Sequence, residues 1–271
     1  MATAYLRAAH QLLDAPPRIL DDPIAVRLLG NAASQKIHGE IERYQSAAAK
    51  ALRSHLVLRS RFTEDRLGAA GQRGVTQYVI LGAGFDTFAL RQPAWANSMM
   101  ILEVDHLGTQ TLKRSHIADA GLPMPANLAF ADIDFEHESL LDGLLRNNIS
   151  LAEPTFFSWL GVTMYLQEAA IVAALQSIAA FPSGSEVVLT FLQPPESGAE
   201  AASLQLAARV AASGEPFVSY FEPEAMAARL TNTGFTRLEF LLPEDANARY
   251  FKPRPADLPA PRRTGIVSAI R

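Results

Sequence analysis

Residues 79–87 read Val-Ile-Leu-Gly-Ala-Gly-Phe-Asp-Thr, an apolar run that ends in a Gly-x-Gly turn. The run predicts a buried strand, and Gly82 and Gly84 give the turn the freedom to let a nucleotide-like ligand approach the backbone closely. The dinucleotide fingerprint would place a third glycine at position 87, where Thr87 stands, so no tight pyrophosphate-binding helix start is indicated. A structural turn that simply needs small residues is the alternative interpretation.

Seven apolar runs, this one included, alternate with helix-like segments from residue 75 onward. Continuous apolar strands between helices predict a mostly parallel sheet with helices on both faces, an α/β architecture of the Rossmann-like kind. A helix is expected over residues 166–181, and another should begin at Pro223 and end near Gly234. The expected strands cover residues 77–82, 99–104, 127–131, 154–160, 186–192, 235–242 and 265–270.

The first 70 residues follow a different pattern from the rest of the chain. They are rich in alanine, their apolar positions recur near helical spacing, and Asp21-Asp22-Pro23 predicts the start of a helix. Because this segment lacks a core of its own, residues 1–70 are expected to form a helical lid over the ligand and not an independent domain. Residues 75–271 then form the Rossmann-like core with an insert at about 194–222, and residues 1–271 form a single domain.

Composition and charge argue against several classes of function. The chain has 271 residues, a formal net charge of −4 and no cysteine, which excludes disulfides, zinc–thiolate sites and cysteine nucleophiles. The acidic balance argues against a dedicated nucleic-acid binder. The N-terminus has no signal-peptide pattern, and the longest weakly charged stretch, residues 154–185, breaks into strand-like and helix-like halves. We therefore expect a soluble, cytoplasmic protein without nucleic-acid or membrane partners.

Acidic residues follow the second and third expected strands. Asp105 lies 23 residues after Gly82, close to the spacing of about 20 residues at which an acid binds ribose hydroxyls. A carboxylate accepts two hydroxyl hydrogen bonds at once, so Asp105 favours an adenosine-containing ligand over the alternative, a solvated acid at a strand end. After the third strand, Asp134 is expected to accept from an adenine amino group, with Phe135 against the ring.

Other chemistries have less support in the sequence. Asp132, Asp134 and His137 suggest a metal site, but no second histidine or carboxylate pair completes a recognised one, so we expect no metal. An NAD(P)-dependent oxidoreductase is the main rival, although Thr87 breaks its glycine pattern and the chain has no Tyr-x-x-x-Lys pair. The Gly-x-Ser-x-Gly elbow of hydrolases and the Gly-Lys of a P-loop are also absent.

The order of motifs along the chain resembles the leucine carboxyl methyltransferase family. The likeness is strongest to its bacterial S-adenosylmethionine-dependent members, which include polyketide O-methyltransferases, and this implies a class I methyltransferase fold, S-adenosylmethionine as cofactor and a role in secondary metabolism. The motifs are Asp21-Asp22-Pro23, Arg59-Ser60-Arg61-Phe62, residues 79–87, Glu103-Val104-Asp105-His106, residues 156–166, Gly214-Glu215-Pro216, Phe221-Glu222-Pro223 and Asn247-Ala248-Arg249-Tyr250-Phe251.

The resemblance also implies which residues hold the cofactor. Among the neighbouring basic residues Arg61 is the second choice for the methionine carboxylate, while Arg53 and Arg66 are expected on a solvated helix face. The implied contacts are Arg59 to the methionine carboxylate, Gly82 and Gly84 beneath the methionine moiety, Asp105 to the ribose, and Asp134 and Phe135 around the adenine.

The acceptor site is expected beside the segment that follows the fourth strand. Tyr165 matches the family's tyrosine and is expected to line the methyl-transfer pocket as the candidate catalytic residue, with a core aromatic as the alternative. Arg249 and Tyr250 match a late motif that could orient an acidic group of the substrate, with a structural salt bridge as the alternative for Arg249. Eukaryotic members carry a glutamate where this chain has Leu160, and this departure favours a small-molecule carboxylate or hydroxyl over a protein carboxylate. None of the six histidines is an evident base; His106 is nearest the expected ligand.

Two further possibilities keep the cofactor but change the outcome. A non-catalytic module could retain the fold and bind S-adenosylmethionine without turnover. The sulfonium also activates two other carbons, so the bound cofactor could react at one of those. The leading hypothesis is O-methylation of a small molecule.

Overall fold

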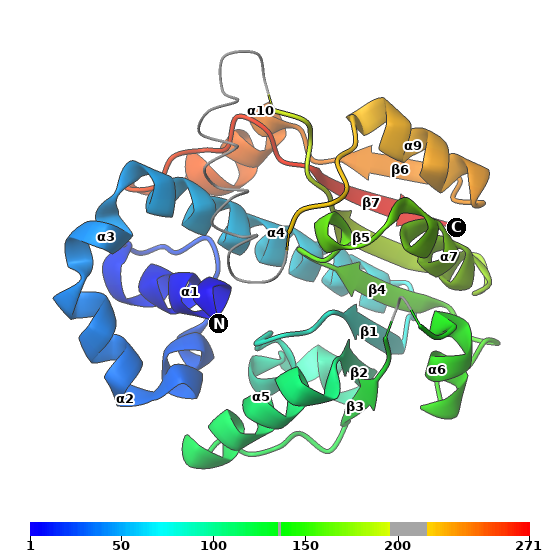
Figure 1. The fold of residues 1–271 in the computed structure, drawn as a ribbon, viewed down its shortest axis with the longest axis horizontal. Coiled ribbons are helices and arrows are strands. Elements are labelled where there is room, and N and C mark those ends of the chain that lie inside the picture. The colour runs from blue at the N-terminus through cyan, green and yellow to red at the C-terminus, as the bar shows by residue number, and fades with distance from the viewer. Residues whose placement is uncertain (135–136, 196–215) are drawn as a thin grey trace.

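The computed structural model describes residues 1–134, 137–195 and 216–271 around a seven-stranded sheet in the order β3-β2-β1-β4-β5-β7-β6 (Figure 1). β7 runs antiparallel to β5 and to β6, and the other neighbouring strands are parallel. The strands are β1 (Gln77–Leu81), β2 (Met100–Asp105), β3 (Leu128–Asp132), β4 (Thr155–Trp159), β5 (Glu186–Thr190), β6 (Arg237–Phe240) and β7 (Ile266–Ile270).

All seven expected strands form, and the mostly parallel α/β sheet is confirmed. The reason is burial on both faces: every residue of β1, β4 and β5 is buried, so these strands need apolar residues at consecutive positions. The parallel register sets Leu81, at the end of β1, beside Val104 of β2 and Trp159 of β4. The carboxyl ends of these three strands therefore lie side by side, where ligands bind in sheets of this kind.

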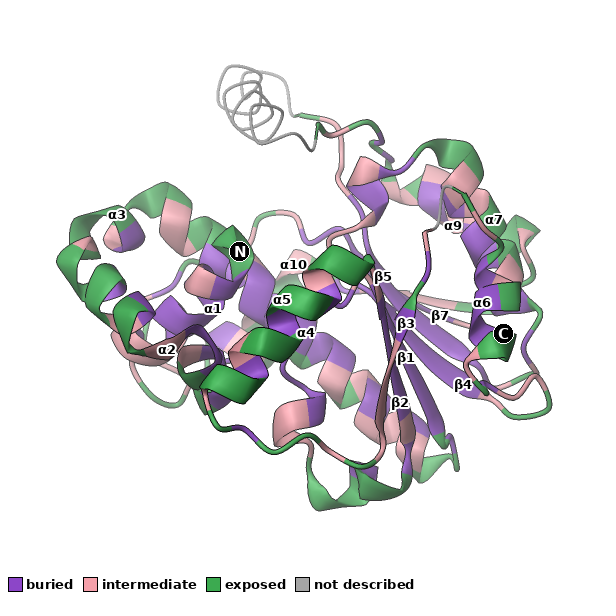
Figure 2. Cartoon of the chain, turned by 60° about the horizontal axis from the view of Figure 1, so that its bottom comes forward, coloured by how far each residue is buried: buried purple, intermediate pink, exposed green. Residues whose placement is uncertain are grey.

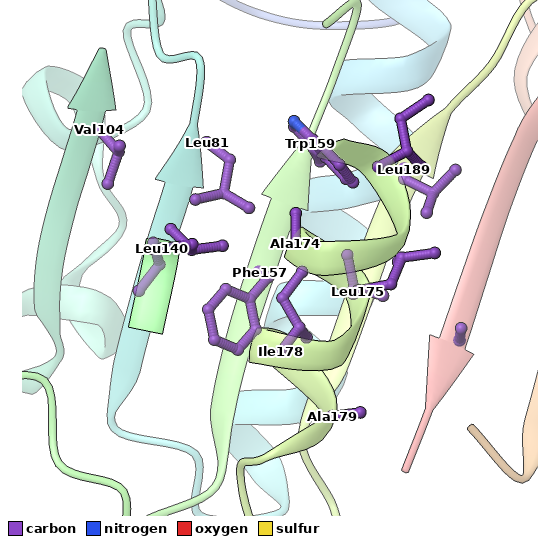
Figure 3. Close-up of a cluster of buried hydrophobic side chains, with 14 of the residues drawn as sticks. Leu81, Val104, Leu140, Phe157, Trp159, Ala174, Leu175, Ile178, Ala179 and Leu189 are labelled. Atoms are coloured by element: carbon purple, nitrogen blue, oxygen red, sulfur yellow. The ribbon is translucent and has the colours of Figure 1, made fainter. Parts of the chain in front are cut away.

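Helices pack on both faces of the sheet. On one face Leu81 and Trp159 pack in a cluster with Ile178 of α7 (Figure 3). Helices α6 and α9 contribute residues to the same cluster. On the other face Ile80 packs in a cluster with Phe62. The core helices are α5 (Leu107–Asp119), α6 (Leu140–Arg146), α7 (Glu168–Ala179), α9 (Pro223–Asn232) and the short α10 (Pro243–Ala246).

Two of these helices form where the sequence predicts them, and α7 is two residues shorter at each end than the expected 166–181. α7 ends before Pro182, which cannot continue the helix, and α9 has Pro223 in its first turn. Gly234 follows the end of α9 with φ of +105°, a conformation that favours glycine. In the described part of the chain, no helix combines the length and the apolar character needed to cross a membrane.

The N-terminal part of the chain is helical and lies to one side of the sheet, as Figure 2 shows for α1 and α2. The Asp22 side chain accepts a hydrogen bond from Ala25 N–H at 3.1 Å and caps α2, which has Pro23 at its first position. Helices α1, α2 and α4 share a small apolar cluster that includes Ala9, Ile37 and Leu56. The helices are α1 (Ala2–Leu13), α2 (Pro23–Gly39), α3 (Ile41–Gln45) and α4 (Ala47–Gln72).

The expectation that Arg53 and Arg66 lie on a solvated helix face is wrong. Arg53 is fully buried, and its Nε and Nη2 donate to the two carboxylate oxygens of Asp14 at 2.7 Å each. His10 Nδ1 lies 2.8 Å from the same carboxylate. Arg66 donates to Glu186 at the start of β5, at 2.6 Å. The carboxylate partners are distant in sequence, so the spacing of the arginines along α4 does not reveal them.

The buried Arg53–Asp14 pair predicts a large stability effect. Asp14→Ala leaves the Arg53 guanidinium buried without its counter-charge, so the free energy of unfolding should fall by about 3–5 kcal/mol in urea titrations. Glu40→Ala is the matched control, because its partner Arg43 is 73% exposed, and it should cost less than about 1 kcal/mol. Equal losses in the two variants would show that Asp14 does not compensate a buried charge.

Candidate functional site at the carboxyl edge of the sheet

The Gly-x-Gly turn follows β1 at the carboxyl edge of the sheet. Gly82 and Gly84 have φ of +68° and +51°, and the N–H groups of Gly82 and Ala83 donate to Val104 O at 2.8 and 3.0 Å. A Cβ at Gly82 would lie 2.3 Å from Val162 Cγ2, whereas a Cβ at Gly84 would meet no atom within 4 Å. Glycine at 82 is therefore required by packing, while Gly84 borders open space.

Asp105 is the last residue of β2, and its carboxylate is fixed against the turn. Oδ2 accepts from Gly84 N–H at 2.6 Å, and Oδ1 accepts from His106 N–H at 2.8 Å. Each carboxylate oxygen has a second lone pair, so both can accept a further hydrogen bond. The structure thus brings together Gly84 and the acid that the sequence spacing paired with the turn.

Arg59 reaches the carboxyl edge from α4. A Cβ at Gly161 would lie 2.5 Å from Arg59 Nη1, so the guanidinium lies directly against the backbone that follows β4. Burial lowers the pKa of Arg59 to about 10, and the positive charge of Arg7 acts in the same direction. Within residues 1–134, 137–195 and 216–271 no carboxylate forms an ion pair with Arg59, whereas Arg61 is half exposed and paired with Asp65.

Contacts connect these residues in a continuous line. Arg59 touches Gly161, the next residue Val162 touches Gly82, and Gly84 binds Asp105. Arg59, which has no paired carboxylate among the described residues, thus lies at one end of the line and the fixed carboxylate of Asp105 at the other, with the open backbone of Gly84 between them. This arrangement fits a ligand that carries a carboxylate at one end and hydroxyls at the other.

The end of β3 and the residue Asp134 after it follow the Asp105 end of this line, because Asp132 is paired in register with Asp105. Asp134 is half-buried and lies 2.8 Å from His137 Nδ1, and Asp132 accepts from Leu107 N–H at 3.0 Å. Phe135 lies outside the described residues. Among the residues that are described, no group of three or more histidine, aspartate or glutamate side chains could hold a metal ion.

Tyr165 lies at the end of a short 3-10 helix, Thr163–Tyr165, after β4. Its ring centroid is 5.5 Å from that of Phe217, and Val218 N–H donates to Met164 O at 2.8 Å, so the end of the expected insert packs against this turn. Residues 196–215 of the insert lie outside the described residues. The Tyr165 hydroxyl also interacts electrostatically with Arg59, which places the two side chains near the same space.

Arg249 and Tyr250 lie elsewhere. The Tyr250 hydroxyl donates to Asp65 at 2.9 Å, and Arg249 lies 3.5 Å from Glu239. They line a cleft of about 570 Å³ with α4 residues such as Arg61, and neither Arg59 nor the glycine turn borders that cleft. The structure therefore brings together Arg59, Gly82, Gly84, Asp105 and Tyr165, and places Arg249 and Tyr250 in a separate cleft.

The sequence interpretation missed the ion cluster beneath the turn. Arg7 of α1 donates to Asp22 at 2.8 Å, to Thr87 at 3.0 Å and to Asp86 at 3.3 Å, and Thr87 donates to Asp22 at 2.7 Å. Arg91 pairs with Asp22 at 3.2 Å and also with a glutamate of α4. The family motifs contain both aspartates, but their roles emerge only from the packing of α1 against the turn.

The strand order, the antiparallel β7 and the glycine turn facing an acid on β2 define the Rossmann-like fold of class I methyltransferases. Two solved structures share this fold. One is a DUF574 family protein from Streptomyces avermitilis, with a TM-score of 0.55, 17% identity and coverage of 98% of this chain and 95% of that chain. The other is a candidate methyltransferase from Thermobifida fusca, with a TM-score of 0.57, 16% identity and coverage of 90% and 91%.

Sequence comparisons identify the family. The model of the leucine carboxyl methyltransferase family matches residues 1–179. A candidate S-adenosyl-L-methionine-dependent methyltransferase of Bacillus subtilis, YktD, is 33% identical over 297 residues, which cover 100% of this chain and 96% of that protein. A similarly named protein of Mycolicibacterium paratuberculosis is 29% identical over 70% of this chain and 73% of its own length.

The chain belongs to the leucine carboxyl methyltransferase family. This confirms the predicted family, the Rossmann-like fold and the predicted enzyme class, a methyltransferase with S-adenosylmethionine as cofactor.

The two glycines should respond differently to alanine. Gly82→Ala should lower the free energy of unfolding by about 1–3 kcal/mol from overpacking, in addition to the cost of positive φ. Gly84→Ala should show only the φ cost, about 1–2 kcal/mol. In a double-mutant cycle measured by urea unfolding, Val162→Ala should recover the steric part of the Gly82→Ala loss. Independent effects of the Gly82 and Val162 changes would contradict the close contact.

Proposed function

We propose that this chain transfers the methyl group of S-adenosylmethionine to an oxygen atom of a small-molecule acceptor. The observation that carries the proposal is the contact line at the carboxyl edge of the sheet, from Arg59 through Gly161 and Gly82 to Asp105. Arg59, unpaired with any carboxylate of the described residues, matches the carboxylate of the cofactor's amino-acid end. The open backbone at Gly84 and the fixed carboxylate of Asp105 match the sulfonium-bearing chain and the ribose. The bound cofactor supplies a methyl group on a positively charged sulfur.

Each residue of the line has a role in binding. Arg59 pairs with the methionine carboxylate, the backbone at Gly82 and Gly84 passes beneath the methionine moiety, and Asp105 accepts from the ribose hydroxyls. Asp134 accepts from the adenine amino group, and Phe135 against the adenine remains a prediction from sequence. The pairing of Arg59 is supported by its position, since Arg61 already pairs with Asp65.

The acceptor site lies beyond Tyr165. Phe156, Phe157 and Trp159 are fully buried in the two core clusters, so they cannot line a pocket. The apolar character of the acceptor site comes instead from the turn that follows β4 and from Phe217, which packs on Tyr165. A small aromatic or aliphatic compound fits such a surface. Arg249 and Tyr250 would contact an acceptor only if it also extended to their separate cleft.

Helices α1 to α4 act as a lid on this site. Arg7 ties α1 to the turn through Asp86, and α4 carries Arg59, so the position of the lid and the shape of the cofactor site depend on each other. Lids of this kind exclude water from the reaction.

The geometry disfavours a dinucleotide at the same turn. Thr87 stands where the third glycine of that fingerprint would be, and its hydroxyl is buried in hydrogen bonds with Arg7 and Asp22. A short 3-10 helix, Ala89–Arg91, follows in place of the long helix whose N-terminus would bind a pyrophosphate.

Cofactor binding provides the first test. Arg59→Gln and Asp105→Asn should each raise the dissociation constant of S-adenosylhomocysteine roughly 10- to 150-fold in calorimetry, because each loses a hydrogen bond to a charged group. Arg61→Gln is the matched control and should bind like the wild type. If NADH raised the thermal stability of the protein and S-adenosylhomocysteine did not, the proposal would be wrong.

Methyl transfer provides the second test. With labelled S-adenosylmethionine, the label should appear on members of a panel of small phenols, alcohols and acids, and not on peptides that end in free carboxylates, because the acceptor surface is small and apolar. Label confined to the peptides would refute a small-molecule acceptor. Cofactor binding with no label on either panel, and a different cofactor fragment in the products, would identify reaction at another carbon.

A further inference from the structure

Helix α4 crosses the whole height of the sheet, and its contacts fix where each turn lies. Arg66 and Arg73 both reach Glu186, the first residue of β5, at the amino edge. Arg59 touches Gly161, which follows the last residue of β4, at the carboxyl edge. The start of α4 therefore extends past the carboxyl edge, on the side where the cofactor site lies.

His55 is one helical turn before Arg59 on α4. A separation of four residues places two side chains on the same helix face, about 6 Å apart along the axis. His55 therefore lies on the Arg59 side of α4 and about 6 Å farther out from the carboxyl edge. Leu52, on the same face one turn earlier, is 42% exposed. His55 and Arg59 also interact electrostatically, so this face of α4 borders the space next to the Arg59 guanidinium.

Among the histidines of the described residues, His55 is the one that is shielded from solvent and lacks a side-chain partner. It is half-buried and has no hydrogen bond or ion pair within the described parts of the chain. His10 binds Asp14, His38 binds Ser34 O, His116 binds Leu28 O and His137 binds Asp134. His106 is exposed at the N-terminus of α5.

The imidazole of His55 stays neutral at physiological pH. Burial lowers the pKa of His55 to about 3, and the adjacent Arg59 charge contributes in the same direction. A neutral imidazole has one ring nitrogen that accepts a hydrogen bond and one that donates. It can therefore accept from a hydroxyl, but it offers no charge to a carboxylate.

Nearby charges also disfavour an acidic acceptor. Arg59 is the cation assigned to the methionine carboxylate, and Arg7 is already paired with Asp22 and Asp86. Among the side chains that the structure describes around Arg59, these leave no uncompensated cation for a second carboxylate. An acceptor that enters this space as a neutral hydroxyl compound avoids that cost of charge burial.

From this placement we propose that the acceptor is a phenol or alcohol and that a ring nitrogen of His55 accepts the hydrogen bond from the hydroxyl that is methylated. The inference rests on the proposed function. As the oxygen–methyl bond forms, the sulfur–methyl bond breaks and its electron pair remains on sulfur as a thioether. The hydroxyl proton, hydrogen-bonded to His55 before the reaction, is released to water. The neutral acceptor and the sulfonium thus yield a neutral ether, S-adenosylhomocysteine and a proton.

Imidazole NMR of the S-adenosylhomocysteine complex tests the contact without requiring turnover. Catechol, phenol and, in mildly acidic buffer where its hydroxyl keeps the proton, 4-nitrophenol should shift the 15N resonances of His55, assigned with His55→Gln, and benzoate should leave them in place. The His38 resonances serve as the internal control. Unmoved His55 resonances with all three phenols, or an equal shift with benzoate, would overturn the inference. Failure of S-adenosylhomocysteine to bind would instead overturn the proposed function.

Kinetics separate a contact with the hydroxyl from a structural role. His55→Phe keeps a planar ring but removes the hydrogen-bond acceptor, so kcat/KM for phenol should fall about tenfold. The kcat/KM for 4-nitrophenol should fall much less, because this phenol is largely ionised in mildly alkaline buffer. His55→Gln should restore part of the loss, because its amide oxygen accepts, and His38→Phe should match the wild type. Equal losses for the two phenols would show that His55 acts only on structure.

Discussion

The ion cluster formed by Arg7, Asp22, Asp86 and Thr87 is the interaction on which the site depends. Burial would raise the pKa of Asp86, but the charges of Arg7 and Lys113 outweigh it and keep that pKa below its usual value. Asp86 is therefore an anion beneath the glycine turn, and Arg7 is held between two carboxylates. Because its members come from α1, the cap of α2 and the turn, the cluster joins the N-terminal helices to the cofactor loop in one unit.

Helix α4 transmits this constraint across the molecule. Arg53 on its first half is locked to α1 through Asp14, Arg59 reaches the carboxyl edge, and Arg66 is anchored on Glu186 at the amino edge. Three arginines on one helix thus fix the position of α4 along the strand direction of the sheet. Every residue between them therefore has a defined position relative to the two edges of the sheet. The location of His55 follows from this arrangement and not from a motif.

The sheet could be predicted from sequence because strands buried on both faces need consecutive apolar residues, a purely local signal. The pairing of Gly84 with Asp105 was also within reach, since the second strand of such folds returns to the first at a regular spacing. The ion pairs of Arg53 and Arg66 could not be predicted in this way, because distant segments of the chain supply their carboxylate partners. The separate place of Arg249 likewise depends on where the chain returns after β6.

The position of β7 between β5 and β6 has a consequence for how the protein is made. β5 ends at Thr190, but β7, its second neighbour beside β4, begins only at Ile266, and within the described part of the chain β6 pairs with β7 alone. On the ribosome, the five parallel strands can assemble early, yet the edge of β5 stays open until the chain up to Ile270 has emerged. For that interval the nascent protein presents an unpaired edge on a strand that contains Val187, Val188 and Leu189, and such edges pair with other chains. The protein is therefore protected against this kind of aggregation only late in its synthesis, when β7 pairs with β5.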